Sequence, residues 1–120
     1  MAKILIVDDS STIILQLEHF LEGAGYEVVV ARDGTEGIEK LEEHDNIDLV
    51  LSDINMPKMN GFEMVKEMTT KKNVKVFMLS TEGDSRMIKK AKEAGAKGYI
   101  IKPFDHDELL RIVGEATKPA

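Results

Sequence analysis

The feature that most constrains the fold is a regular alternation of short apolar runs with longer amphipathic segments. The apolar runs are rich in Val, Ile and Leu and lie at 3–7, 27–31, 48–52, 74–79 and 98–101. Continuous apolar strands are typical of a parallel sheet, because helices cover both of its faces. The sequence therefore predicts an α/β fold, a doubly wound parallel sheet of five strands with helices on both faces.

The segments between these runs have helical periodicity and recognisable ends. The predicted helices cover 11–22, 34–43, a segment that follows Asn60, 84–94, and a segment that starts at Asp105. Asn60 and Asp105 are each followed three residues later by a glutamate, Glu63 and Glu108, which is the spacing of a capping box. Gly95 is expected to end the fourth helix, because glycine adopts left-handed backbone easily.

Length and composition predict one domain that occupies residues 1–117, with a short tail at 118–120. A chain of 120 residues can bury one core. The net charge of −6 and the lack of a basic cluster argue against nucleic acid or an anionic membrane as a partner. The chain has no cysteine, no stretch apolar enough to span a bilayer, and no signal sequence at its start. We therefore expect a cytoplasmic protein.

Polar residues follow four of the five predicted strands. Asp8 and Asp9 follow the first strand, Asp53 the third, Ser80 the fourth and Lys102 the fifth. In a parallel sheet all of these positions lie at the carboxyl edge, where doubly wound folds bind their ligands. Any one of them has an ordinary explanation as a helix cap, a loop acid or a turn. Their joint occurrence at one edge favours a site.

Three aspartates at this edge require a cation. Two unit charges about 4 Å apart repel by about 4 kcal/mol at an effective dielectric constant of about 20. Oxygen ligands suit Mg²⁺, which joins carboxylates to phosphate groups, and Mn²⁺ is expected to be able to substitute for it. The three histidines, at 19, 44 and 106, have no ligand spacing and are interpreted as surface residues.

A carboxylate, a metal ion, a hydroxyl and a lysine together suit phosphoryl transfer. In this interpretation Asp53 attacks phosphorus and becomes an acyl phosphate, while Asp8 and Asp9 hold the metal directly or through water. Ser80 and Lys102 would contact the phosphoryl oxygens.

Three segments also resemble a known family. Residues 4–10, 51–61 and 98–104 read ILIVDDS, LSDINMPKMNG and GYIIKPF. They resemble the response-regulator receiver domain of two-component signalling, most closely its single-domain chemotaxis type, and the resemblance covers essentially the whole chain. It implies a flavodoxin-like strand order of 2-1-3-4-5. It also implies that a histidine kinase phosphorylates Asp53 and that Mg²⁺ is bound by Asp8, Asp9, Asp53 and the backbone carbonyl of Asn55.

The resemblance also implies an output mechanism. A downstream target would bind the face formed by the fourth helix, fifth strand and fifth helix, after Ser80 moves toward the phosphate and Tyr99 turns inward. Asn55 and Glu82 stand where the family tunes dephosphorylation. Thr81 stands where the family often has a smaller residue, and we expect it to crowd the phosphoryl site. A cis peptide is implied between Lys102 and Pro103. We expect a monomer, with dimerisation on activation left open.

Other functions fit the sequence less well. A phosphatase or dehalogenase with an aspartate nucleophile would carry a second acid two residues later, where this chain has Asn55, so an enzyme acting on free substrates is not expected. A flavin or nucleotide module would need a phosphate-binding loop after the first strand, where this chain is acidic. A phosphate sink, a phosphorelay intermediate and a protein-binding module independent of phosphorylation remain open alternatives.

Overall fold

The computed structural model describes residues 2–54, 56 and 59–118, and its sheet has the predicted order β2-β1-β3-β4-β5. All neighbouring strands are parallel. The strands are β1 (Lys3–Val7), β2 (Glu27–Ala31), β3 (Leu49–Asp53), β4 (Lys75–Ser80) and β5 (Gly98–Ile101). The helices are α1 (Ser11–Gly23), α2 (Gly34–Glu43), α3 (Gly61–Lys71), α4 (Ser85–Ala94) and α5 (His106–Ala116). The predicted doubly wound fold is confirmed.

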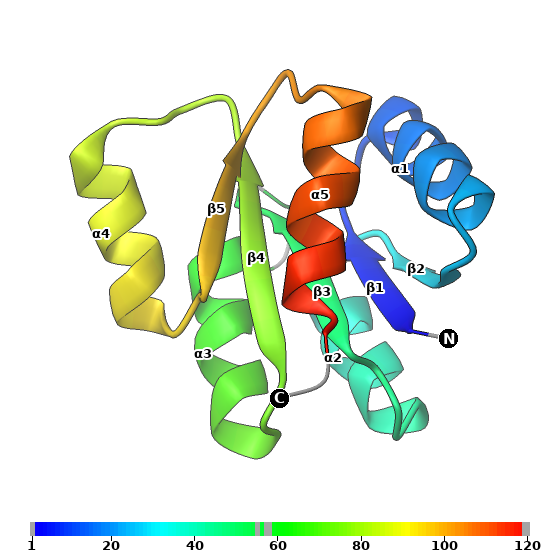
Figure 1. The fold of residues 1–120 in the computed structure, drawn as a ribbon. Coiled ribbons are helices and arrows are strands. Elements are labelled where there is room, and N and C mark those ends of the chain that lie inside the picture. The colour runs from blue at the N-terminus through cyan, green and yellow to red at the C-terminus, as the bar shows by residue number, and fades with distance from the viewer. Residues whose placement is uncertain (1, 55, 57–58, 119–120) are drawn as a thin grey trace.

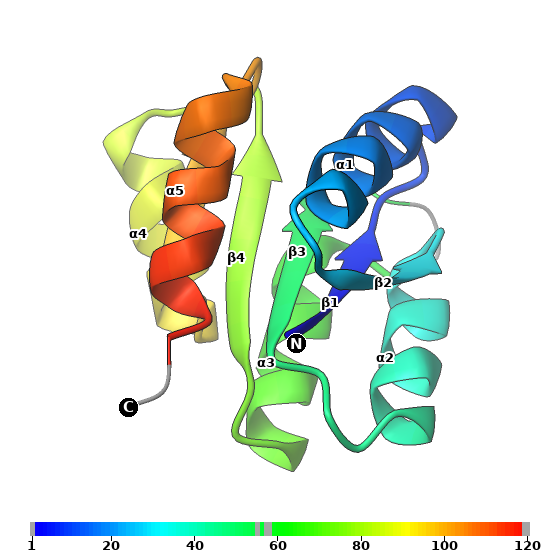
Figure 2. The same cartoon turned by 45° about the vertical axis from the view of Figure 1, so that its right-hand side comes forward.

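Helices cover both faces of the sheet and bury a separate apolar cluster on each. Helices α1 and α5 pack on one face, and α2, α3 and α4 pack on the other (Figures 1 and 2). Strand β1 contributes Leu5 and Val7 to one cluster and Ile4 and Ile6 to the other, all with no exposed surface. Burial on both faces explains why this strand reads as an uninterrupted apolar run.

Two strands are shifted by one residue from the prediction, and the shift affects the site. Strands β3 and β4 begin and end one residue later than the predicted 48–52 and 74–79. The ladder continues through the pairs Asp53 with Leu79 and Ser80 with Ile101. Asp53 and Ser80 are therefore the last residues of strands, where ladder pairing restrains the backbone, and not the first residues of loops.

The predicted helix caps are confirmed at α3 and only partly at α5. Asn60 Oδ1 accepts a hydrogen bond from the backbone N–H of Glu63 at 3.0 Å, and its amide Nδ2 donates to Glu63 Oε1 at 2.9 Å. The glutamate thus reaches the cap's side chain instead of its backbone. Asp105 occupies the N-cap position of α5 but makes no side-chain cap bond. Gly95 ends α4 with φ of +114°, as predicted.

Among the described residues, no helix is both long enough and apolar enough to cross a membrane.

Candidate functional site

Asp8, Asp9 and Asp53 converge at the carboxyl edge of the sheet. Strands β1 and β3 are neighbours, and their ladder pairs Val7 with Ser52, so the residues that follow, Asp8 and Asp53, emerge side by side. Carboxylate oxygens of all three aspartates lie within 4.8 Å of one another. The predicted acidic cluster is therefore formed.

Asp8 is the most buried of the three, with no exposed surface. Its Oδ1 accepts a hydrogen bond from the backbone N–H of Ser10 at 2.9 Å, and its Oδ2 lies 3.4 Å from Lys102 Nζ. A buried carboxylate is costly unless it is paired and hydrogen-bonded. Lys102 therefore supplies the counter-charge that the buried Asp8 requires.

Asp53 lies partly buried between the same lysine and its own strand. Its Oδ1 accepts a hydrogen bond from the N–H of Ile54 at 2.9 Å and lies 3.5 Å from Lys102 Nζ. Burial raises the pKa of Asp53 above its ordinary value, and the nearby charge of Asp8 raises it further. Lys102 and the Ile54 N–H oppose these effects only in part. Asp53 is thus a carboxylate that would gain from added positive charge.

Gly61 allows the loop after Asp53 to return close to β3. Its N–H donates to the carbonyl of Ile54 at 2.7 Å. A Cβ at position 61 would lie 2.6 Å from the backbone oxygen of Asp53 and 2.8 Å from Cα of Ile54. Any other residue there would displace the backbone that carries Asp53.

The donor set at this edge fits Mg²⁺. It consists of carboxylate oxygens, and Mg²⁺ commonly completes an octahedral shell around such ligands with water and a phosphate oxygen. The fourth predicted ligand, the carbonyl of Asn55, lies outside the described residues.

Ser80, Thr81, Glu82 and Tyr99 form the other side of the same edge. Ser80 is 3% exposed, and its Oγ accepts a hydrogen bond from the N–H of Glu82 at 3.0 Å. The hydroxyl of Tyr99 donates to the carbonyl of Glu82. The backbone of Glu82 is therefore held by both residues, whereas Thr81 is exposed.

Lys102 follows directly after β5. Its backbone N–H donates a hydrogen bond to the carbonyl of Ser80 at 2.8 Å. The Lys102–Pro103 peptide is cis, as the resemblance implied. Lys102 is 13% exposed at its side chain and lies within 3.5 Å of both Asp8 and Asp53. The structure thus brings together the described residues that the sequence assigned to the site.

Sequence reasoning missed Arg32, which also reaches the site. Its side chain contacts the backbone of Asp9 and the hydroxyl of Ser11. The only available signal was its position directly after β2, the one strand end that carried no group with obvious metal or phosphoryl chemistry.

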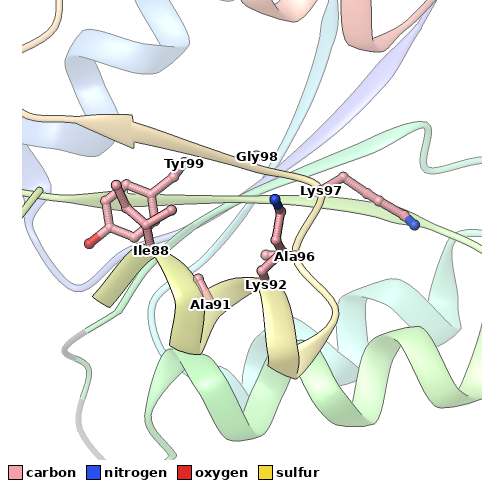
Figure 3. A pocket seen from close by; sticks show the side chains of 7 residues that line it. All are labelled: Ile88, Ala91, Lys92, Ala96, Lys97, Gly98 and Tyr99. Carbon is pink, nitrogen blue, oxygen red and sulfur yellow. The ribbon is translucent and has the colours of Figure 1, made fainter. Parts of the chain in front are cut away.

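A shallow pocket lies between α4 and β5, away from the acidic cluster. Ile88, Ala91 and Ala96 are its apolar lining residues, Tyr99 lies beside Ile88, and Lys97 lies toward the opposite end (Figure 3). Lys92 and Gly98 complete its lining. The pocket combines apolar surface with positive charge.

The profile of the response regulator receiver domain matches residues 4–114. The chain belongs to this family. The chemotaxis protein CheY of Treponema pallidum is 39% identical over 119 residues, which cover 97% of this chain and 83% of that protein. CheY of Thermotoga maritima is 37% identical over 118 residues, covering 97% of this chain and 98% of that one.

Solved structures of receivers have the same fold. Chemotaxis protein CheY4 of Vibrio cholerae superposes with a TM-score of 0.91 at 39% identity, covering 97% of this chain and 98% of that one. The CheX–CheY–BeF₃–Mg²⁺ complex of Borrelia burgdorferi gives a TM-score of 0.91 at 36% identity, covering 98% of this chain and 90% of the matched one.

The chain is therefore a CheY-like receiver domain of two-component signalling. Receivers of this kind are signalling proteins that histidine kinases phosphorylate and that bind downstream targets, and they bind Mg²⁺ at an acidic site. The predicted family and its chemotaxis type are confirmed.

Proposed function

We propose that this receiver accepts a phosphoryl group from a histidine kinase on Asp53, in a Mg²⁺-dependent reaction, and signals by binding a target protein, in chemotaxis. The observation that carries the proposal is the convergence of Asp8, Asp9 and Asp53 within 4.8 Å beside Lys102. This arrangement supplies a nucleophile, metal ligands and a fixed cation in one place.

Asp8, Asp9 and Asp53 would hold Mg²⁺ through their carboxylate oxygens, with the carbonyl of Asn55 as a further ligand. When bound, Mg²⁺ supplies positive charge to the phosphoryl oxygens and offsets the repulsion among the carboxylates. The presence of Mg²⁺ in the CheX–CheY–BeF₃–Mg²⁺ complex of Borrelia burgdorferi supports Mg²⁺ as the ion.

Asp53 would act as the nucleophile. Its Oδ1 is engaged by Ile54 and Lys102, whereas Oδ2 accepts no hydrogen bond from any described residue. An oxygen of Asp53 forms a bond to phosphorus while the bond from phosphorus to the donor breaks. For a phosphohistidine donor, the bonding electron pair returns to the imidazole nitrogen. The product is an acyl phosphate on Asp53.

Lys102 and Ser80 would stabilise the transferred group. Lys102 Nζ already lies 3.5 Å from Asp53, so it can pair with a phosphoryl oxygen there after small movements. The Oγ of Ser80 accepts a bond from Glu82, which leaves its hydroxyl hydrogen able to be donated to a phosphoryl oxygen.

The target would bind the face formed by α4, β5 and α5. This face carries the pocket lined by Ile88, Lys92 and Tyr99 (Figure 3). Tyr99 bonds to the carbonyl of Glu82, and Glu82 bonds to Ser80, so a movement of Ser80 toward the phosphate would be transmitted to the pocket. Thr81 and Glu82, which are both exposed beside Ser80, would influence phosphoryl lifetime.

The test is the intact mass of the protein after incubation with acetyl phosphate, with and without Mg²⁺. We expect the wild type to gain one phosphoryl group only with Mg²⁺, and Asp53→Asn to gain none. Asp45→Asn is the matched control, because it removes an exposed carboxylate before β3, at the opposite edge of the sheet. Equal labelling of Asp53→Asn and the wild type would refute the assignment of the nucleophile.

A further inference from the structure

Arg32 connects the end of β2 to the loop that carries Asp9. Its guanidinium Nη2 donates to the backbone carbonyl of Asp9 at 3.2 Å and to the hydroxyl of Ser11 at 2.8 Å. The two acceptors lie before and at the start of α1. One guanidinium therefore joins two loops at the carboxyl edge.

Arg32 is itself held in place by α2. Its backbone N–H donates to Glu36 Oε1 at 2.9 Å, and the N–H of Glu36 donates to Asp33 Oδ1 at 2.8 Å. These bonds fix the turn from β2 into α2 at the residue that carries the guanidinium. The contact to Asp9 thus starts from a restrained position.

Few other interactions restrain Asp9. Unlike Asp8, it is exposed, and its carboxylate makes no hydrogen bond or ion pair with any described residue. Within the described part of the chain, the bond from Arg32 is the only hydrogen bond between Asp9 and another element. The direction of the Asp9 carboxylate therefore depends on a backbone that Arg32 restrains.

We propose that Arg32 is a positioning residue of the metal site, which fixes Asp9 through its carbonyl and through Ser11 and thereby favours Mg²⁺ over Ca²⁺. The proposal rests on the metal site proposed above. Mg²⁺ requires near-ideal octahedral geometry at about 2.0–2.1 Å, whereas Ca²⁺ accepts longer and more variable distances. Loss of the restraint should therefore weaken Mg²⁺ binding more than Ca²⁺ binding.

Geometry and charge make opposite predictions for this residue. Arg32 is a cation near a cluster of carboxylates, so a purely electrostatic role would disfavour any dication. Its removal would then strengthen the binding of Mg²⁺ and Ca²⁺ alike, because the two ions carry the same charge. A positioning role predicts weaker binding and a loss of discrimination.

The experiment is calorimetric titration of the full chain with MgCl₂ and separately with CaCl₂, for the wild type, Arg32→Ala, Ser11→Ala and Arg111→Ala. For Arg32→Ala we expect the Kd for Mg²⁺ to rise about tenfold, the usual effect of losing a group that orients a ligand. The Kd for Ca²⁺ should rise less. Ser11→Ala should shift the ratio in the same direction by a smaller factor, with no change of charge.

Arg111→Ala is the charge control, because Arg111 is exposed on α5 and forms no hydrogen bond or ion pair with Asp9. It should leave the ratio of the two Kd values unchanged. Tighter binding of both ions to Arg32→Ala, or an equal loss for both, would overturn the proposal while leaving the metal site intact. Failure of the wild type to bind Mg²⁺ would overturn the proposed function and this inference with it. A circular dichroism melt confirms that each variant is folded.

Discussion

The two halves of the carboxyl edge are stabilised in different ways. The acidic half, formed by Asp8, Asp9 and Asp53, places three carboxylates within 4.8 Å of one another. The neutral half, formed by the hydroxyls of Ser80 and Tyr99 and the backbone of Glu82, is joined by hydrogen bonds between uncharged groups. A bound cation would therefore stabilise the acidic half. The neutral half must exchange hydrogen bonds in order to change its conformation.

Lys102 lies where the two halves meet. Its ammonium contacts Asp8 and Asp53, and its backbone N–H bonds to Ser80. Metal binding and conformational change can therefore be separated by mutation, because different residues and different forces govern them. Variants in each half should affect one property and spare the other.

The largest effect is expected for Asp8→Asn in the acidic half. This change removes a buried ligand charge, so the affinity for Mg²⁺ should fall by about 100-fold, at the upper end of effects seen for groups that support a metal site. Calorimetric titration measures it, with Asp45→Asn as the control for net charge. An affinity within a factor of about two of the wild type would contradict the assignment of Asp8 as a ligand.

Lys102→Ala should destabilise the metal-free protein by about 3 kcal/mol, because it leaves the buried Asp8 without its counter-charge. Urea unfolding measures the loss. Saturating Mg²⁺ should restore most of it, since the ion replaces the missing positive charge. A loss that Mg²⁺ leaves unchanged would show that Lys102 stabilises the fold by packing and not by its charge.

Asp53→Asn should stabilise the metal-free protein at pH 7, because it removes a carboxylate whose charged form is disfavoured in the folded state. Because the pKa of Asp53 is raised in the folded protein, the folded chain binds this proton more tightly than the unfolded chain. The wild type therefore loses free energy of unfolding as the pH rises from the ordinary pKa of 3.8 through the raised value.

The difference in free energy of unfolding between Asp53→Asn and the wild type should accordingly shrink as the pH is lowered toward 3.8, because the wild-type carboxyl then becomes protonated and neutral. Urea unfolding at a series of pH values without metal measures this. A stabilisation by Asp53→Asn that is the same at every pH would mean that the substitution acts through packing.

The smallest effect is expected for Ser80→Ala in the neutral half. Loss of the bond to the N–H of Glu82 should cost about 0.5–1 kcal/mol of unfolding free energy, because that N–H is near enough to the surface to find water. The affinity for Mg²⁺ should stay within about twofold of the wild type. A large change in that affinity would show that the two halves are coupled.

The sequence predicted the architecture well, because its signals are local. Apolar runs such as 3–7 are continuous because they are buried on both faces, and the caps of α3 depend on residues three apart. The boundaries of β3 and β4 were missed by one residue, because ladder pairing with a neighbouring strand decides where a strand ends.

By itself the sequence determined which residues reach the carboxyl edge, since a parallel sheet sends every strand end to the same side. That rule was enough to predict that Asp8, Asp53, Ser80 and Lys102 lie at the same edge. Only the tertiary structure decided which atoms meet there. The bond from Arg32 to Asp9 and the raised pKa of Asp53 depend on the spacing between separate elements and on burial, and neither is encoded in any local stretch of the chain.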